Sequence, residues 1–121
     1  MKKIPTKKTL ILLFGLITSP WLLAHNSLTD SVPGDQATLH QSPEFIELRF
    51  SDETYLNAVS LVNINGEEVE FETEVTKSLS RYFQIPVPIL EPGSYKFTWQ
   101  VEGMDTHKIN GDFEFSVMDR R

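Results

Sequence analysis

The chain contains no cysteine among its 121 residues. Disulfide bonds and thiolate metal sites are therefore excluded, and the core of the folded domain must provide stability alone. Histidine is scarce as well, because it occurs only at positions 25, 40 and 107. No Ser/His/Asp or Cys/His arrangement accompanies these histidines to support nucleophilic catalysis, and we expect a protein that is not an enzyme.

Basic residues are also few. The chain has 11 lysines and arginines against 17 acidic residues, and a formal net charge of −6. Four of the lysines lie in the first eight residues, so the rest of the chain is more acidic still. We expect no nucleic-acid partner, because binding nucleic acid requires a basic surface. The acidity fits an attraction for cations, although solubility alone also explains it.

A long apolar run is missing too. Residues 1–8 carry four lysines and no acid, residues 9–17 are nearly all apolar, and a Thr-Ser-Pro break precedes a short apolar stretch ending at Ala24. This layout is typical of a secretory signal peptide. A membrane helix needs about 20 apolar residues, which makes an uncleaved anchor the less favoured alternative. We expect a signal peptide at residues 1–24 and one domain at residues 25–121.

Helical periodicity is absent after residue 25, whereas short runs of β-branched and aromatic residues recur between Gly, Pro and Asn. This pattern predicts an all-β fold, an antiparallel seven-strand sandwich with Greek-key connections. Asn65-Gly66 predicts a hairpin turn, and Asn110-Gly111 precedes the last expected strand. Aromatic residues at 95, 97 and 99 alternate, which favours core packing over a sugar-binding platform. Strands are expected at residues 45–50, 58–64, 68–71, 81–87, 94–101 and 112–117.

Asp105 and His107 are the first candidate metal ligands. They lie two positions apart, after the strand that is expected to end at Val101. In an extended segment such positions point to the same side, so the carboxylate and the imidazole would converge. Taken alone, the pair fits an exposed His–Asp contact as well as a metal site.

His25 would add two further ligands. Cleavage after Ala24 would make His25 the first residue of the mature chain, where its α-amine and its imidazole could bind one ion together. With Asp105 and His107, the set contains three nitrogens and one oxygen. Cu(II) prefers tetragonal nitrogen and oxygen ligands, so these residues predict a Cu(II) site.

Four stretches of the chain occur in the order and spacing of one protein family. They are the amino-terminal His25 with Ser31-Val32-Pro33-Gly34, residues 46–51 (IELRFS), residues 90–101 (LEPGSYKFTWQV) and residues 105–115 (DTHKINGDFEF). Together they resemble the CopC/PcoC family of periplasmic copper-binding proteins, and the chain looks like a short stand-alone member. The likeness spans nearly the whole mature chain.

The resemblance implies a cupredoxin-like or immunoglobulin-like β-sandwich of seven strands. It also implies a periplasmic protein that binds Cu(II) through His25, Asp105 and His107 and acts as a copper carrier in homeostasis or resistance. A CopD-type inner-membrane protein is the implied partner, and we expect a monomer.

The chain departs from the family pattern at three places. Several members have a Met-rich loop for Cu(I), whereas this mature chain has only Met104 and Met118, so we expect Cu(II) alone. Asp52 follows the Phe-Ser pair, where the family often has Glu. Lys108 follows the Asp-x-His motif in place of Pro, and a cation there would lower the affinity for copper modestly.

The remaining candidates have plainer interpretations. His40 lies in a polar segment, where we expect an exposed structural role, with a second weak metal site as the alternative. The glutamates between positions 67 and 74 fit a solvated strand face or a docking patch. Two other functions stay open: an interaction module without metal, and an enzyme like the lytic polysaccharide monooxygenases, for whose substrate face the chain leaves little room.

Overall fold

The computed structural model describes residues 27–71 and 78–119. The predicted signal peptide and His25 lie outside the described residues. Within these two ranges the regular elements are strands, which confirms the all-β prediction, and no helix there is long and apolar enough to cross a membrane. The strands are β1 (Leu28–Val32), β2 (Ala37–Leu39), β3 (Phe45–Asn63), β4 (Ser80–Pro86), β5 (Gly93–Gly103) and β6 (Lys108–Val117).

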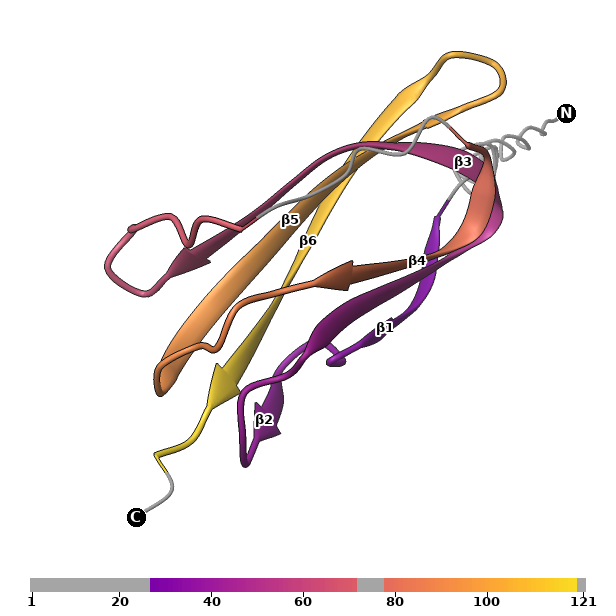
Figure 1. Ribbon diagram of the computed structural model, residues 1–121. Helices are drawn as coiled ribbons and strands as arrows, with labels where there is room; N and C mark the ends of the chain where they lie inside the picture. The colour runs from indigo at the N-terminus through magenta and orange to yellow at the C-terminus, as the bar shows by residue number, and fades with distance from the viewer. Residues whose placement is uncertain (1–26, 72–77, 120–121) are drawn as a thin grey trace, which may run out of the picture.

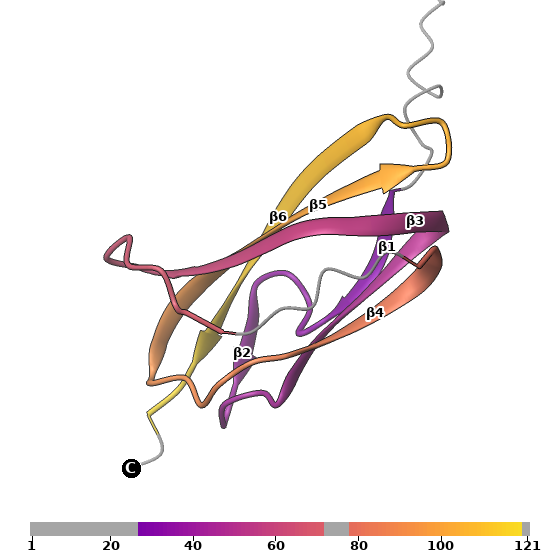
Figure 2. The ribbon, with the colours of Figure 1, turned by 45° about the horizontal axis from the view of Figure 1, so that its top comes forward.

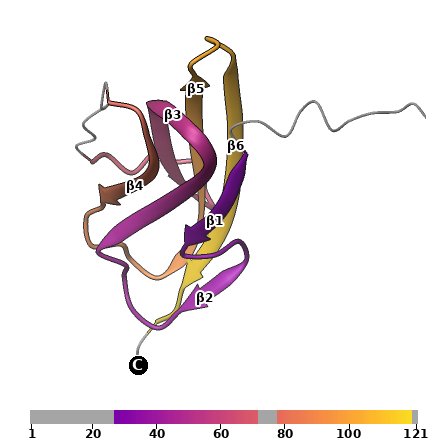
Figure 3. The same cartoon turned by 90° about the vertical axis from the view of Figure 1, so that its right-hand side faces the viewer.

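The longest strand, β3, belongs to both layers of the sandwich (Figures 1 and 3). Its first half pairs antiparallel with β1 and β4, and its second half pairs antiparallel with β5. The sheet continues from β5 to β6 and then to β2, which runs parallel to β6. The register of β3 against β4 shifts between Arg49 and Thr54, where the strand passes from one layer to the other.

Two strands predicted separately, residues 45–50 and 58–64, are the two halves of β3. Between the two halves, Thr54 is fully buried and its Oγ1 donates a hydrogen bond to the Glu102 carbonyl at 2.8 Å. A satisfied hydroxyl can be buried at little cost, so the strand continues. Residues 68–71 contribute only an isolated bridge to β3. The described residues therefore form six strands where seven were expected.

The two Asn-Gly pairs have different roles. The turn at Asn65-Gly66 is confirmed, and Gly66 has a φ of 84°. Asn110-Gly111 lies inside β6 instead of preceding it, and Gly111 pairs with Trp99 on β5. A Cβ atom on Gly111 would stand 2.2 Å from Cζ2 of Trp99. The second glycine therefore makes room for an indole ring and does not form a turn.

The core lies between the two layers and is rich in aromatic rings. Tyr95, Phe97 and Trp99 point inward from alternate positions of β5, with exposed fractions of 7, 0 and 5 %. Trp99 packs edge-to-face on Phe50, with ring centroids 5.1 Å apart. These contacts confirm that the alternating aromatic residues are core residues. The other buried apolar residues are Ile46, Leu48, Leu56, Leu61, Phe83, Ile85, Leu90, Val101, Phe113, Phe115 and Val117.

The start of β1 and the turn between β5 and β6 lie at the same end of the sandwich (Figure 2). Two hydrogen bonds join Ser27 to Ser51: the N–H of Ser51 donates to the Ser27 carbonyl at 2.8 Å, and the N–H of Ser27 donates to Oγ of Ser51 at 3.1 Å. Farther along β3, Thr54 pairs with Gly103, the last residue of β5. Through β3, the first described residue is thus tied to the turn that follows β5.

Candidate metal centre

A tight turn joins β5 to β6 at residues 104–107. The N–H of Gly103 donates to the His107 carbonyl at 3.1 Å, and the N–H of Thr106 donates to the Gly103 carbonyl at 3.0 Å. Thr106 has a φ of 68°, in the left-handed region. A type I turn followed by a left-handed residue is a common way to build a three-residue hairpin loop. The loop reverses the chain directly after Gly103.

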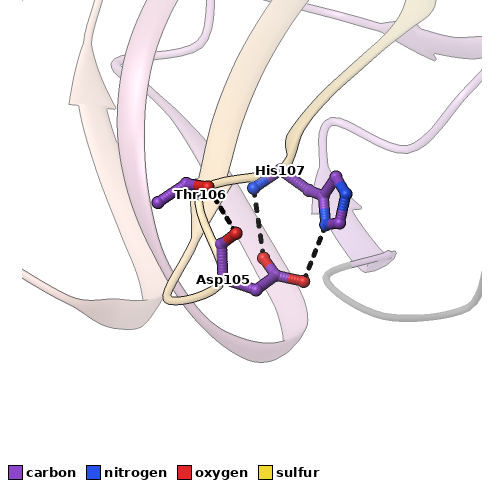
Figure 4. A network of polar contacts seen from close by, with 3 residues as sticks. All are labelled: Asp105, Thr106 and His107. Carbon is purple, nitrogen blue, oxygen red and sulfur yellow. Dashed lines mark hydrogen bonds and ion pairs between the residues drawn. The ribbon is translucent and has the colours of Figure 1, made fainter.

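This turn brings Asp105 and His107 together (Figure 4). Oδ1 of Asp105 accepts a hydrogen bond from the backbone N–H of His107 at 3.2 Å, and Oδ2 lies 2.9 Å from Nδ1 of the His107 ring. The predicted convergence is confirmed, but the predicted reason, an extended segment, is wrong. A carboxylate that binds the N–H two residues on forms an Asx turn. Spacing in the sequence does not distinguish this turn from a strand.

Each partner shifts the ionisation of the other. The hydrogen bond with the His107 ring lowers the pKa of Asp105. The hydrogen bond with Asp105, together with the negative charge of the carboxylate, raises the pKa of His107. The side chains of His107 and Asp105 are 81 % and 57 % exposed, so solvent screens this contact and it adds little to stability. The same exposure leaves both groups accessible to an ion in solution.

The described residues supply part of a metal centre. Asp105 offers carboxylate oxygens and His107 offers ring nitrogen, with Nε2 turned away from the carboxylate (Figure 4). Residues 27–71 and 78–119 contain no group of three His, Cys, Asp or Glu side chains that could hold a metal ion. A tetragonal centre would therefore need further donors besides this pair. The α-amine and imidazole of His25 are the predicted complement, and they fit the nitrogen and oxygen character of the pair.

His40 lies far from the turn. It is exposed and follows β2, whose Leu39 pairs with Val117 at the end of β6. The turn instead precedes Lys108 at the beginning of β6, and this strand is 10 residues long. At 3.3 Å per residue the two ends are roughly 30 Å apart. His40 is not part of the centre, and its expected exposure is confirmed.

The remaining candidates lie on different parts of the molecule. Met104 is 73 % exposed in the turn, whereas Met118 is bound to the far end through its N–H, which donates to the Leu39 carbonyl at 2.8 Å. The two thioethers therefore cannot bind one ion together. Asp52 lies 3.9 Å from an Arg81 nitrogen in an exposed ion pair. Glu67, Glu68 and Glu70 are exposed, as expected for a solvated face.

Sequence reasoning missed two residues that shape this end of the molecule, Ser51 and Thr106. Ser51 holds the beginning of β1 through its Oγ and its backbone. Thr106 provides the left-handed residue of the loop. The short gap between two β-type runs was the available signal for a hairpin loop, although such loops more often show glycine at this position.

The chain matches the CopC domain family over residues 28–118. Protein YobA of Escherichia coli (strain K12) is 31 % identical over 112 residues, which span 88 % of this chain and 89 % of YobA. The copper transport protein CutJ of Bacillus subtilis (strain 168) is 25 % identical over a match that spans 89 % of this chain and 21 % of CutJ. The likeness to YobA thus spans most of both chains, whereas CutJ is a much longer chain.

Two crystal structures share the arrangement of the strands. CopC from Methylosinus trichosporium OB3b superimposes with a TM-score of 0.71 and 26 % identity, covering 80 % of this chain and 97 % of that one. PcoC, a methionine-rich copper resistance protein from Escherichia coli, superimposes with a TM-score of 0.62 and 27 % identity, covering 78 % and 99 %. Because the family match spans nearly all of the described residues and both structures share the β-sandwich, the chain belongs to the CopC family.

Proposed function

We propose that the protein is a periplasmic carrier of Cu(II) that acts in copper homeostasis or resistance. In this proposal the signal peptide at residues 1–24 is removed, and residues 25–121 form a single monomeric domain. The copper ligands are the α-amine and imidazole of His25, the carboxylate of Asp105 and the imidazole of His107. The observation that carries the proposal is the Asp105–His107 pair, held on a tight turn at the end of the sandwich where β1 begins.

The names of the relatives support a role with copper. CutJ is a copper transport protein, and PcoC is a copper resistance protein. This chain shares its fold with PcoC along nearly the whole length of PcoC. The two proteins therefore have a domain in common, which supports a copper-related function for this chain. Whether the role is transport or resistance depends on the partner proteins of this domain.

In this proposal, the short link from His25 to Ser27 allows His25 to join the centre. Two peptide steps separate it from Ser27, and the chain extends at most about 3.6 Å per residue, so the two Cα atoms lie within about 7 Å. Ser27 is held to Ser51 by two hydrogen bonds. This attachment supports a centre in which the amine and the imidazole of His25 join Asp105 and His107.

Copper is the cargo in this proposal, and three nitrogens with one oxygen suit its divalent form. Cu(II) prefers such tetragonal ligands and heads the affinity order of the divalent ions. The α-amine, with an ordinary pKa of about 7.7–8.0, and both imidazoles must lose their protons before they bind. Asp105 raises the pKa of His107, so protons compete for this ring at higher pH than usual. Acid therefore promotes release without a change of oxidation state.

The exposure of the pair suits a carrier. The pair projects from an exposed turn, where a second protein can take the ion directly. A CopD-type inner-membrane protein is the proposed recipient.

The test is a Cu(II) titration of the exported protein, produced from the full chain with its own leader. Mass spectrometry first establishes that the protein begins at His25. We expect one Cu(II) per chain, bound more tightly than micromolar, with nitrogen couplings in the EPR spectrum. His25→Ala should remove most of the affinity, while His40→Ala serves as the matched histidine control and should bind as the unaltered protein does. Equal binding by His25→Ala, or binding no tighter than micromolar, contradicts the proposal.

A further inference from the structure

Two described residues other than glycine have positive φ angles, Gln36 at 69° and Thr106 at 68°. The conformation of Gln36 has a structural explanation. Its N–H donates to the Glu114 carbonyl at 2.6 Å, and Oδ1 of the preceding Asp35 accepts from the N–H of Glu114 at 3.0 Å. These bonds attach the loop ahead of β2 to β6. Gln36 is thus held in the left-handed region by its attachment to a neighbouring strand.

Thr106 has no comparable attachment. A branched side chain in the left-handed region is a conformational outlier, because its Cβ substituents crowd the backbone. Thr106 is exposed, so burial in the core does not offset this strain. The loop position it occupies is normally taken by glycine or asparagine, which adopt this conformation readily. The stability of the hairpin therefore does not explain why threonine occupies this position.

The contacts of Thr106 are all within the loop that carries the donor pair. Its Oγ1 donates a hydrogen bond to the carbonyl of Asp105, and its N–H closes the turn on Gly103 at 3.0 Å. The left-handed step at Thr106 turns His107 back so that its N–H and its ring both meet the Asp105 carboxylate. A glycine could make the same step, but it would allow many other conformations and would lack the hydroxyl.

We propose that Thr106 is a positioning residue that restricts Asp105 and His107 to one arrangement. In this proposal the backbone strain at Thr106 is retained because of this role. The proposal rests on the copper site proposed above. Strained residues persist where the surrounding structure holds them, and they cluster at functional sites. Thr106 preorganises the donor pair before copper arrives, so the pair loses little freedom when the ion binds.

The experiment compares Thr106→Gly with the unaltered protein and with Gln36→Gly, which removes the other left-handed strain far from the site. Each exported protein is measured for thermal unfolding, for Cu(II) affinity by competition with a chromogenic chelator, and, without metal, for amide exchange of His107 by NMR. We expect Thr106→Gly to unfold at the same or a higher temperature, yet to bind Cu(II) about fivefold to tenfold more weakly and to exchange the His107 amide several-fold faster. Gln36→Gly should leave affinity and His107 exchange within about twofold.

Thr106→Ser provides the conservative rescue, because it retains the hydroxyl. We expect its affinity to lie within about twofold of that of the unaltered protein. The inference is overturned if Thr106→Gly binds Cu(II) as tightly as the unaltered protein and its His107 amide exchanges at the same rate. If the unaltered protein itself fails to bind Cu(II), the proposed function fails, whereas the exchange rates of the metal-free variants still decide whether Thr106 restricts the pair.

Discussion

Strands β5 and β6 form one ladder of ten residue pairs, but this ladder and the turn that closes it are held by different forces. Along the ladder, Tyr95, Phe97 and Trp99 are buried between the layers. At the turn, Asp105 and His107 are exposed and are held by hydrogen bonds within a few residues. Burial stabilises the first region by about 1.5–3 kcal/mol per side chain, while solvent screens the contacts of the second. Stability and ion binding should therefore be separable by mutation.

The largest expected effect belongs to the core region. Phe97→Ala would remove a fully buried ring and should lower the free energy of unfolding by about 3–5 kcal/mol. Chemical denaturation followed by Trp99 fluorescence measures this change, because the other tryptophan lies in the predicted leader. The variant molecules that remain folded should bind Cu(II) with unchanged affinity. A large loss of affinity in the folded fraction would show that the two regions are coupled.

The second effect belongs to the turn. His107→Ala should weaken Cu(II) binding by at least about 100-fold, since it removes one proposed ligand. Its free energy of unfolding should change by less than about 0.5 kcal/mol, because the side chain is 81 % exposed. Calorimetric titration with Cu(II) and urea denaturation test the two halves of this expectation. A variant that is strongly destabilised would mean that the pair is part of the fold.

Asp105→Asn tests the turn separately, through its effect on the pKa of His107. Asp105 raises the pKa of His107, so the substitution should return the His107 pKa toward its ordinary value of about 6.5. In the unaltered protein, the contribution of His107 to stability is lost as pH rises through its raised pKa, and that of Asp105 is lost as pH falls through its lowered pKa. Because both groups are exposed, stability between these limits should vary only slightly.

An NMR titration of the metal-free protein measures the His107 pKa in both forms. The same pKa in both would mean that the pair does not persist in solution. Cu(II) affinity should also fall in Asp105→Asn, by about tenfold or more, because the amide is a poorer ligand for this ion.

The smallest effect is expected at Ser51, which holds the beginning of β1 against β3. Ser51→Ala would remove the acceptor for the N–H of Ser27 but keep the backbone bond between the two residues. We expect a loss of about 1 kcal/mol or less in stability and faster amide exchange at Ser27. Thr29→Val is the matched control, because Thr29 donates to the Arg49 carbonyl on the same strand pair. Only Ser51→Ala should also weaken Cu(II) binding, by a few-fold.

The sequence predicts the fold class because most strands alternate clearly between buried and exposed positions. It fails where the deciding partner is distant along the chain. Thr54 reads as part of a polar break, but its hydroxyl partner is the carbonyl of Glu102, 48 positions away. Asn110-Gly111 has the sequence pattern of a turn, but Gly111 makes room for the Trp99 ring across the ladder. Rules that consider only neighbouring residues cannot predict either contact.

The candidate site shows the same division. Asp105 and His107 are predictable as a pair because they are two positions apart. Their actual conformation is not predictable, because a threonine at position 106 argues against the left-handed step that joins them. The signal-peptide pattern supplies His25 as a candidate, and its role as a ligand stays a prediction because it lies outside the described residues.

The course of β3 through both layers also limits how the chain can change in length during evolution. Ser51 on β3 meets the beginning of β1, and Thr54 meets the end of β5. Adding or removing one residue between them would turn every later side chain of β3 to the opposite face. It would also shift the beginning of β1 relative to the turn after β5. Among relatives of this chain, insertions should therefore be rare at positions 52–53.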